Sequence, residues 1–208
     1  MPLIMLKTLR FIIPGILVYL FAAYLGGVTK LWSMGLPDLE KAKYTPSLIL
    51  PGLLYYITPL RRWINKPHHE SLSEHIRTEL VKAAGVEDRP RKYTWRAMKP
   101  LFFDLIDNDA SLKTKSNLAY FNGAIWSTCA DATSIGIFYL IISIIFHYLL
   151  NINGSLLAAL TFLIIIIAGF VGSLITTRIQ KNIATEQIDV IKYKYIFNLE
   201  SRIVDLDR

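Results

Sequence analysis

The sequence predicts an all-α, polytopic membrane protein with four transmembrane helices and a small helical cytoplasmic subdomain. Three observations predict this class: one long stretch without charged residues, two shorter uncharged segments before it, and a strong imbalance of basic residues between the segments that they separate. Hydrophobic residues make up 53% of the 208-residue chain. They occur in blocks, whereas a soluble domain would disperse them at helix or strand periods.

The longest uncharged stretch lies between Asp131 and Arg178 and contains 46 positions. A bilayer core requires roughly 20 apolar residues per helix, so this stretch is long enough to cross twice. Residues 151–155 (Asn-Ile-Asn-Gly-Ser) interrupt it with residue types that favour a turn. We therefore expect two antiparallel transmembrane helices over residues 132–150 and 156–177.

Two further uncharged segments precede this hairpin. Residues 11–29, between Arg10 and Lys30, predict a first span with Pro14 in its first turn, where proline is tolerated. Residues 44–60 are shorter and contain three prolines. They fit a kinked spanning helix, which the charge balance favours, or a re-entrant element that stays buried in protein.

The basic residues predict the orientation. With four spans, the N-terminus, the segment 61–131 and the C-terminal tail share one side and carry 20 Lys and Arg residues, against three on the other side. Lys and Arg collect on the cytoplasmic side of membrane proteins. We therefore expect an inner-membrane protein with both termini in the cytoplasm.

The chain divides into an N-terminal transmembrane pair (1–60), a basic cytoplasmic helical segment (61–131), the hairpin (132–177) and a cytoplasmic helical tail (178–208). Within 61–131, helices are expected over 69–84, 95–106 and 111–121. Ser71 and Glu74 form a capping-box pattern at the first of these, Gly85 ends it, and Asn122-Gly123 ends the third. The tail has apolar residues at steps of mostly four and predicts an uninterrupted continuation of the last span.

The densest polar cluster near the hairpin suggests two interpretations. Carboxylates and a lysine at this density could perform acid–base chemistry, which predicts a membrane-bound enzyme acting on lipid or lipid-linked phosphate through Asp104, Asp107, Asp109 and Lys113. No partner nucleophile accompanies them at a telling spacing, so structural ion pairs are favoured. We expect no cofactor and no metal: residues 107–111 resemble a calcium loop, but Leu112 and Leu118 stand where it requires Gly and Glu.

Small and polar residues mark the predicted spans. Small residues four apart let membrane helices approach closely and suggest a homo-oligomer; they are Ala22, Gly26, Ala168, Gly169, Gly172 and Ser173. Polar residues within spans are candidates for a pore or a membrane-facing polar site; they are Ser143, His147 and Thr161.

A basic, aromatic segment follows the first cytoplasmic helix. It is suited to docking on anionic lipid headgroups or on a cytoplasmic protein partner, and its position between spans makes nucleic acid the less favoured ligand. The residues concerned are Arg89, Arg91, Lys92, Trp95 and Arg96.

In layout alone, with several spans and a small basic cytoplasmic part, the chain resembles the small multi-pass components and effectors of prokaryotic defence systems. The resemblance implies an oligomeric membrane component that couples a cytoplasmic signal or partner to membrane rearrangement or conductance. Because layout carries no chemistry, it is an analogy of architecture. Alternatives are the membrane-bound enzyme and a passive membrane anchor for a soluble partner.

Overall fold

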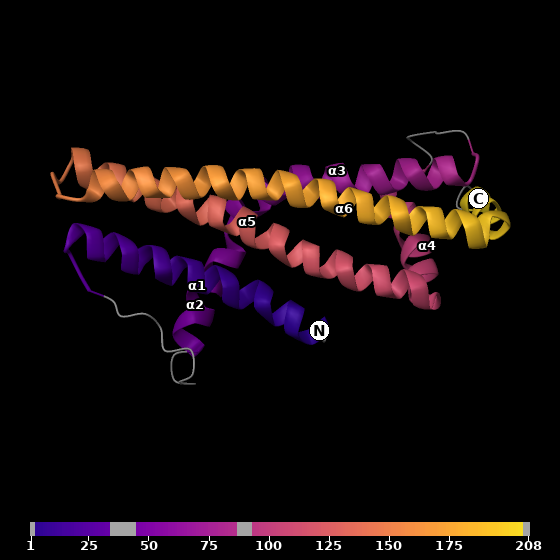
Figure 1. Cartoon of the computed structure of the whole chain (residues 1–208), viewed down its shortest axis with the longest axis horizontal. Coiled ribbons are helices and arrows are strands. Elements are labelled where there is room, and N and C mark those ends of the chain that lie inside the picture. The colour runs from indigo at the N-terminus through magenta and orange to yellow at the C-terminus, as the bar shows by residue number, and fades with distance from the viewer. Residues whose placement is uncertain (1–2, 34–44, 87–92, 206–208) are drawn as a thin grey trace. The chain divides into compact units, whose positions relative to one another are not determined.

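The computed structural model describes residues 3–33, 45–86 and 93–205, and these residues are almost entirely helical. Figure 1 shows the order of the helices along the chain. Their bounds are α1 Leu3–Thr29, α2 Thr45–Ile57, α3 Pro59–Ala83, α4 Trp95–Asn108, α5 Ala110–Tyr148 and α6 Ser155–Asp205. The described residues contain no β-strand, so the predicted all-α class is confirmed for them.

The chain forms two compact units. Unit 1 comprises Met1–Asn65 and Ala124–Ile175, and unit 2 comprises Lys66–Gly123 and Thr176–Arg208. Helices α3, α5 and α6 each contribute residues to both units.

Among the described residues, three helices are long and apolar enough to cross a membrane, namely α1, α5 and α6. This suggests membrane association and fits a multi-pass protein. Four spans are not shown, because α2 has only 13 residues. At 1.5 Å per residue it is about 20 Å long, against roughly 30 Å for a hydrocarbon core.

Unit 1 packs α1 against the α5–α6 hairpin through aromatic side chains. Phe21 lies 5.8 Å from Tyr139 and 5.3 Å from Phe162, measured between ring centroids. The hydroxyl of Tyr139 donates to the carbonyl of Val18 at 2.9 Å. At the other end of α1, the carbonyl of Val28 lies against Gly154 in the α5–α6 turn. Helix α1 therefore runs parallel to α5, and its N-terminal end lies at the end of unit 1 away from that turn.

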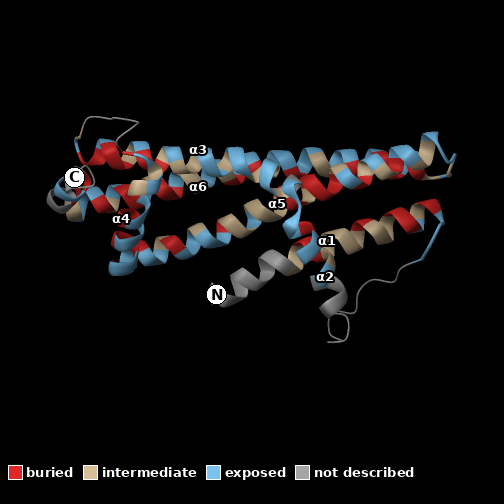
Figure 2. Cartoon of the chain, turned by 180° about the vertical axis from the view of Figure 1, so that it is seen from behind, coloured by how far each residue is buried: buried red, intermediate tan, exposed pale blue. Residues whose placement is uncertain are grey.

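The predicted turn between the two long helices is confirmed. Helix α5 ends at Tyr148 and α6 begins at Ser155. Asn151 and Gly154 have positive φ angles of 51° and 80°, conformations that Asn and Gly adopt more readily than other residues. The outward surfaces of both helices in unit 1 are rich in Ile, Leu and Phe. Figure 2 shows exposed positions along both helices.

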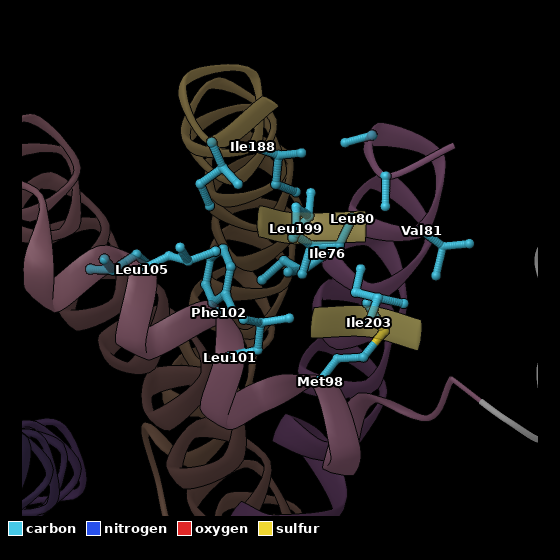
Figure 3. Packing of buried hydrophobic residues seen from close by; sticks show 14 of the residues in the cluster. Ile76, Leu80, Val81, Met98, Leu101, Phe102, Leu105, Ile188, Leu199 and Ile203 are labelled. Carbon is cyan, nitrogen blue, oxygen red and sulfur yellow. The ribbon is translucent and has the colours of Figure 1, made fainter. Parts of the chain in front are cut away.

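Unit 2 has a hydrophobic core of its own, built from α3, α4, the start of α5 and the end of α6. Figure 3 shows how these side chains converge, with Leu80 from α3, Phe102 from α4 and Leu199 from α6 among those labelled. Helix α4 has the expected start, since the side chain of Thr94 accepts a hydrogen bond from the backbone of Ala97.

Three expected helix boundaries are wrong. Helix α3 begins at Pro59 and not at residue 69, because proline is well suited to a first helical position and the capping-box residues lie in the helix interior. Helix α5 does not end at Asn122-Gly123, because the buried Asn122 amide bonds to α6. Helix α6 is not uninterrupted: Tyr195, with φ −128° and ψ 16°, breaks it.

Candidate functional site

Asp131 on α5 is the centre of a buried polar network in unit 1. It is the last charged residue before the 46 uncharged positions, and only 1% of its surface is exposed. Arg61 donates to its carboxylate twice, from Nε at 2.8 Å and from Nη2 at 3.4 Å. The Tyr55 hydroxyl donates to the same carboxylate at 3.1 Å and lies 2.7 Å from Ser134 Oγ. We call these four residues the Asp131 network.

The junction between α2 and α3 brings two of these side chains to Asp131. Helix α2 ends at Ile57, and Thr58 donates to the Tyr55 carbonyl from its backbone nitrogen at 2.9 Å and from its hydroxyl at 2.6 Å. Pro59 then starts α3. The guanidinium of Arg61 also lies over the Tyr56 ring, 4.5 Å from its centroid. Tyr55 and Arg61 therefore approach one carboxylate from two consecutive helices.

The Asp131 network balances its charges. A buried charge is costly unless it is paired and hydrogen-bonded, and a guanidinium that donates to both carboxylate oxygens is a strong form of such pairing. With one carboxylate and one guanidinium, the pair is neutral overall. These bonds hold the α2–α3 junction against α5. A competing partner for either charge would break the ion pair and weaken this contact.

In unit 2, Asp109 caps α5 and anchors the break in α6. Its carboxylate accepts from the backbone nitrogens of Ser111 at 2.8 Å and Leu112 at 3.1 Å, and from the Ser111 hydroxyl. Lys194 donates to it at 2.7 Å and the Tyr195 hydroxyl at 2.9 Å. These hydrogen bonds, the one from Lys194 foremost, hold the pKa of Asp109 well below its usual range.

The other members of the predicted acidic cluster do not converge on one site. Asp104 pairs with Arg202 at 2.7 Å and accepts from Asn108 at 2.9 Å. Asp107 and Lys113 are exposed, and their side chains make no hydrogen bond or ion pair within the described residues. Asp104 and Asp109 thus each bind a basic side chain of α6, which is the geometry of structural ion pairs.

Two histidines of α3 face threonines of α6 in unit 2. His68 Nδ1 lies 3.1 Å from Thr177 Oγ1, and His75 Nε2 lies 2.9 Å from Thr185 Oγ1. Burial lowers the pKa of His68. No group of three His, Cys, Asp or Glu side chains among residues 3–33, 45–86 and 93–205 could hold a metal ion.

Most of the small residues of the spans pack within the chain. A Cβ added at Gly172 would lie 2.8 Å from Cys129 Sγ on α5, and one added at Gly169 would lie 2.6 Å from Thr133 Oγ1. A Cβ at Gly26 would meet the Trp32 ring, which donates to the Ala22 carbonyl at 3.1 Å. The neighbouring Ser173 is buried and donates to the Phe170 carbonyl at 2.8 Å, whereas Ala168 is exposed.

The polar candidates within the spans also have partners in unit 1. Ser143 is buried and donates to the Tyr139 carbonyl at 2.8 Å. Thr161 Oγ1 lies 2.7 Å from the Tyr24 hydroxyl, which joins α6 to α1. The ring of His147 packs edge-on against Tyr148 near the turn.

The predicted basic patch is described only in part. Arg89, Arg91 and Lys92 lie outside the described residues. Trp95 is half-buried and packs against Phe102 with ring centroids 5.9 Å apart, so it supports the core of unit 2. Arg96 is exposed.

A comparison of the chain with known protein families, curated proteins and solved structures finds no match. The described residues define a class, a multi-pass α-helical protein with three membrane-compatible helices among them.

Sequence reasoning missed the Asp131 network. It used Asp131 as the boundary of the longest uncharged stretch and did not connect it with Arg61. The two residues are 70 positions apart, so no local pattern joins them. One signal was present: an Asp and an Arg each standing at the edge of an uncharged segment are expected at similar depth, where pairing is favourable.

Proposed function

We propose that this protein is a multi-pass membrane component that transmits a change in unit 2 to the packing of the membrane helices in unit 1. The observation that carries this proposal is the Arg61–Asp131 ion pair. Its two residues come from α3 and α5, and both helices continue into unit 2, where Leu80 of α3 and Leu112 of α5 are fully buried in the hydrophobic core. A displacement of either helix in unit 2 would therefore act on the buried ion pair.

The proposal includes an orientation with both termini in the cytoplasm. Helix α1 runs parallel to α5, so its N-terminal end lies at the Asp131 end of unit 1. By Tyr55 the chain has returned to that same end, since Tyr55 bonds to Asp131. With this connectivity, the N-terminal end of α1 and the α2–α3 junction lie at the same end of unit 1. Together with the excess of basic residues, this arrangement favours a cytoplasmic Asp131 end.

Two other expectations, self-association and enzymatic activity, stay predictions, and part of the evidence for each has a second explanation. Self-association was inferred from small-residue faces, and Gly169 and Gly172 are occupied by α5 of the same chain. The enzyme alternative relied on acidic residues of which Asp104 and Asp109 are paired with Arg202 and Lys194. The described contacts join helices to one another, which supports the proposed coupling between them.

The test perturbs unit 2 and measures unit 1. Ile191 is fully buried in the unit 2 core, and replacing such a residue by alanine typically costs about 2–5 kcal/mol. Cys129, the only cysteine, reports on unit 1 because its sulfur lies against Gly172. Alkylation of Cys129 by N-ethylmaleimide in proteoliposomes should be about tenfold faster, or more, in Ile191→Ala. If about 1.4 kcal/mol of the destabilisation reaches unit 1, the population of locally open states around Cys129 rises tenfold.

Tyr193→Ala is the matched control, because Tyr193 lies on the same helix and is 88% exposed. Its alkylation rate should stay within about twofold of the unmodified protein, as surface substitutions usually change stability by less than about 0.5 kcal/mol. If Ile191→Ala loosens unit 2, shown by faster proteolysis there, while the Cys129 rate is unchanged, the two units are not coupled and the proposal fails.

A further inference from the structure

Helix α2 presents an exposed apolar face. Leu50, Leu53, Leu54 and Ile57 follow the spacing of one helical face, and Leu54 and Ile57 are 61% and 77% exposed. The opposite side of the helix buries Gly52 and Tyr55. Four large apolar side chains on one face of a 13-residue helix require an apolar environment.

The position of α2 within unit 1 indicates which environment this is. Tyr55 bonds to Asp131 and Ser134, and Asp131 marks the start of the uncharged stretch. The C-terminal end of α2 therefore lies at the depth where the membrane spans begin. Helix α2 packs on α1 and runs across it, not alongside it (Figure 1).

The residues that follow α2 suit a lipid–water boundary. Arg62 is exposed, and Trp63 is 71% exposed. Tryptophan favours the headgroup level of a bilayer because its ring is apolar and its N–H is polar. Arginine binds phosphate through its planar set of donors. The guanidinium of Arg61 is paired with Asp131, whereas Arg62 is exposed and can reach a headgroup.

We propose that α2 lies in the plane of the bilayer at the Asp131 end of the spans, as an interfacial lipid-binding surface. Leu50, Leu53, Leu54 and Ile57 face the acyl chains, while Arg62 and Trp63 contact the headgroups of anionic phospholipids. Lipid is the occupant because the exposed sides of α5 and α6 in the same unit are also apolar, and a bilayer around those helices would meet the α2 face at the Asp131 end.

The first experiment measures depth. Spin labels at Leu54→Cys and Ile57→Cys, in a Cys129→Ser background, are placed in nanodiscs of phosphatidylcholine with phosphatidylglycerol. Both labels should collide readily with oxygen and poorly with a water-soluble nickel chelate, as a label at Ile164→Cys in the α6 span does. A label at Lys192→Cys, exposed in unit 2, should show the opposite. If the labels on α2 were as accessible to the nickel chelate as the label at position 192, the face would lie in water and the proposal would be overturned. Dipolar broadening between the α2 labels would also overturn it, because a second copy would then cover the face.

The second experiment tests the headgroup. Phosphatidylglycerol should raise the thermal unfolding midpoint of the unmodified protein above its value in phosphatidylcholine alone, and Arg62→Gln should lose most of that increase. Lys192→Gln, which removes the same charge from an exposed site in unit 2, should keep it. An increase that survives in Arg62→Gln, or that both variants lose equally, contradicts a specific role for Arg62.

Discussion

Replacing Asp131 by asparagine removes one charge of a buried ion pair and keeps its shape. The side chains of Asp131 and Arg61 are 2% and 12% exposed, so the remaining guanidinium would stay largely buried without its counter-charge. Breaking such a pair by removing one partner typically costs about 3–5 kcal/mol. Because Arg61 keeps some exposure and a long flexible stem, we expect the lower end, about 3 kcal/mol. For a chain of this size that lowers the unfolding midpoint by about 6–12 °C.

The assay is thermal unfolding in nanodiscs, followed by circular dichroism, for Asp131→Asn, Arg61→Met and the double variant. Each single variant should have a lower unfolding midpoint than the unmodified protein. The double variant should recover most of that decrease, because replacing both charges of a buried pair often changes stability little. Additive losses in the double variant, or an Asp131→Asn midpoint within about 2 °C of the unmodified protein, would refute the inference that these two charges depend on each other.

Two further substitutions test the packing in each unit. Gly172→Leu should lower stability by about 1–3 kcal/mol, because its side chain must displace Cys129, whereas Gly27→Leu, with no atom within 4 Å of an added Cβ, should have little effect in the same thermal assay; equal losses would contradict the proposed α5–α6 contact. Asp109→Asn should flatten the acid dependence of stability. The folded-state pKa of Asp109 lies below its unfolded value of about 4, so its contribution is present above pH 4 and is lost as the pH falls further. Midpoints measured from neutral to acidic pH should converge for the two proteins, and parallel curves would count against this role.

The hairpin was predictable because its signals are local. A run of uncharged residues and a turn of Asn, Gly and Ser specify two helices without reference to the rest of the chain. The first helix ends at Tyr148 and the second begins at Ser155, close to the expected residues 150 and 156. Helix α4 was predictable for the same reason, since Thr94 directly precedes it and caps it.

Long-range contacts account for most of what the sequence did not reveal. Asn122-Gly123 resembles a helix end, but Gln180 and the Thr176 carbonyl satisfy the Asn122 amide, so α5 continues. No Pro or Gly near Tyr195 predicts the break in α6. The break coincides with the hydrogen bond from the Tyr195 hydroxyl to Asp109, which is 86 positions away. The face of Gly169 and Gly172 was recognisable as a packing surface, but spacing alone does not tell a helix of the same chain from one of a neighbour.

The proposed coupling gives the buried Arg61–Asp131 ion pair a role beyond stability. A well-packed apolar pair would hold α3 against α5 about as strongly, so stability alone does not explain two buried charges. Charges differ from apolar groups in that water, lipid phosphate or a displaced partner can replace one of them. The double variant Arg61→Met with Asp131→Asn separates these roles, because it should unfold near the normal temperature and yet lose the response of Cys129 to Ile191→Ala. A double variant that transmits that change as the unmodified protein does would show that α5 and α6 suffice, and that the pair serves packing alone.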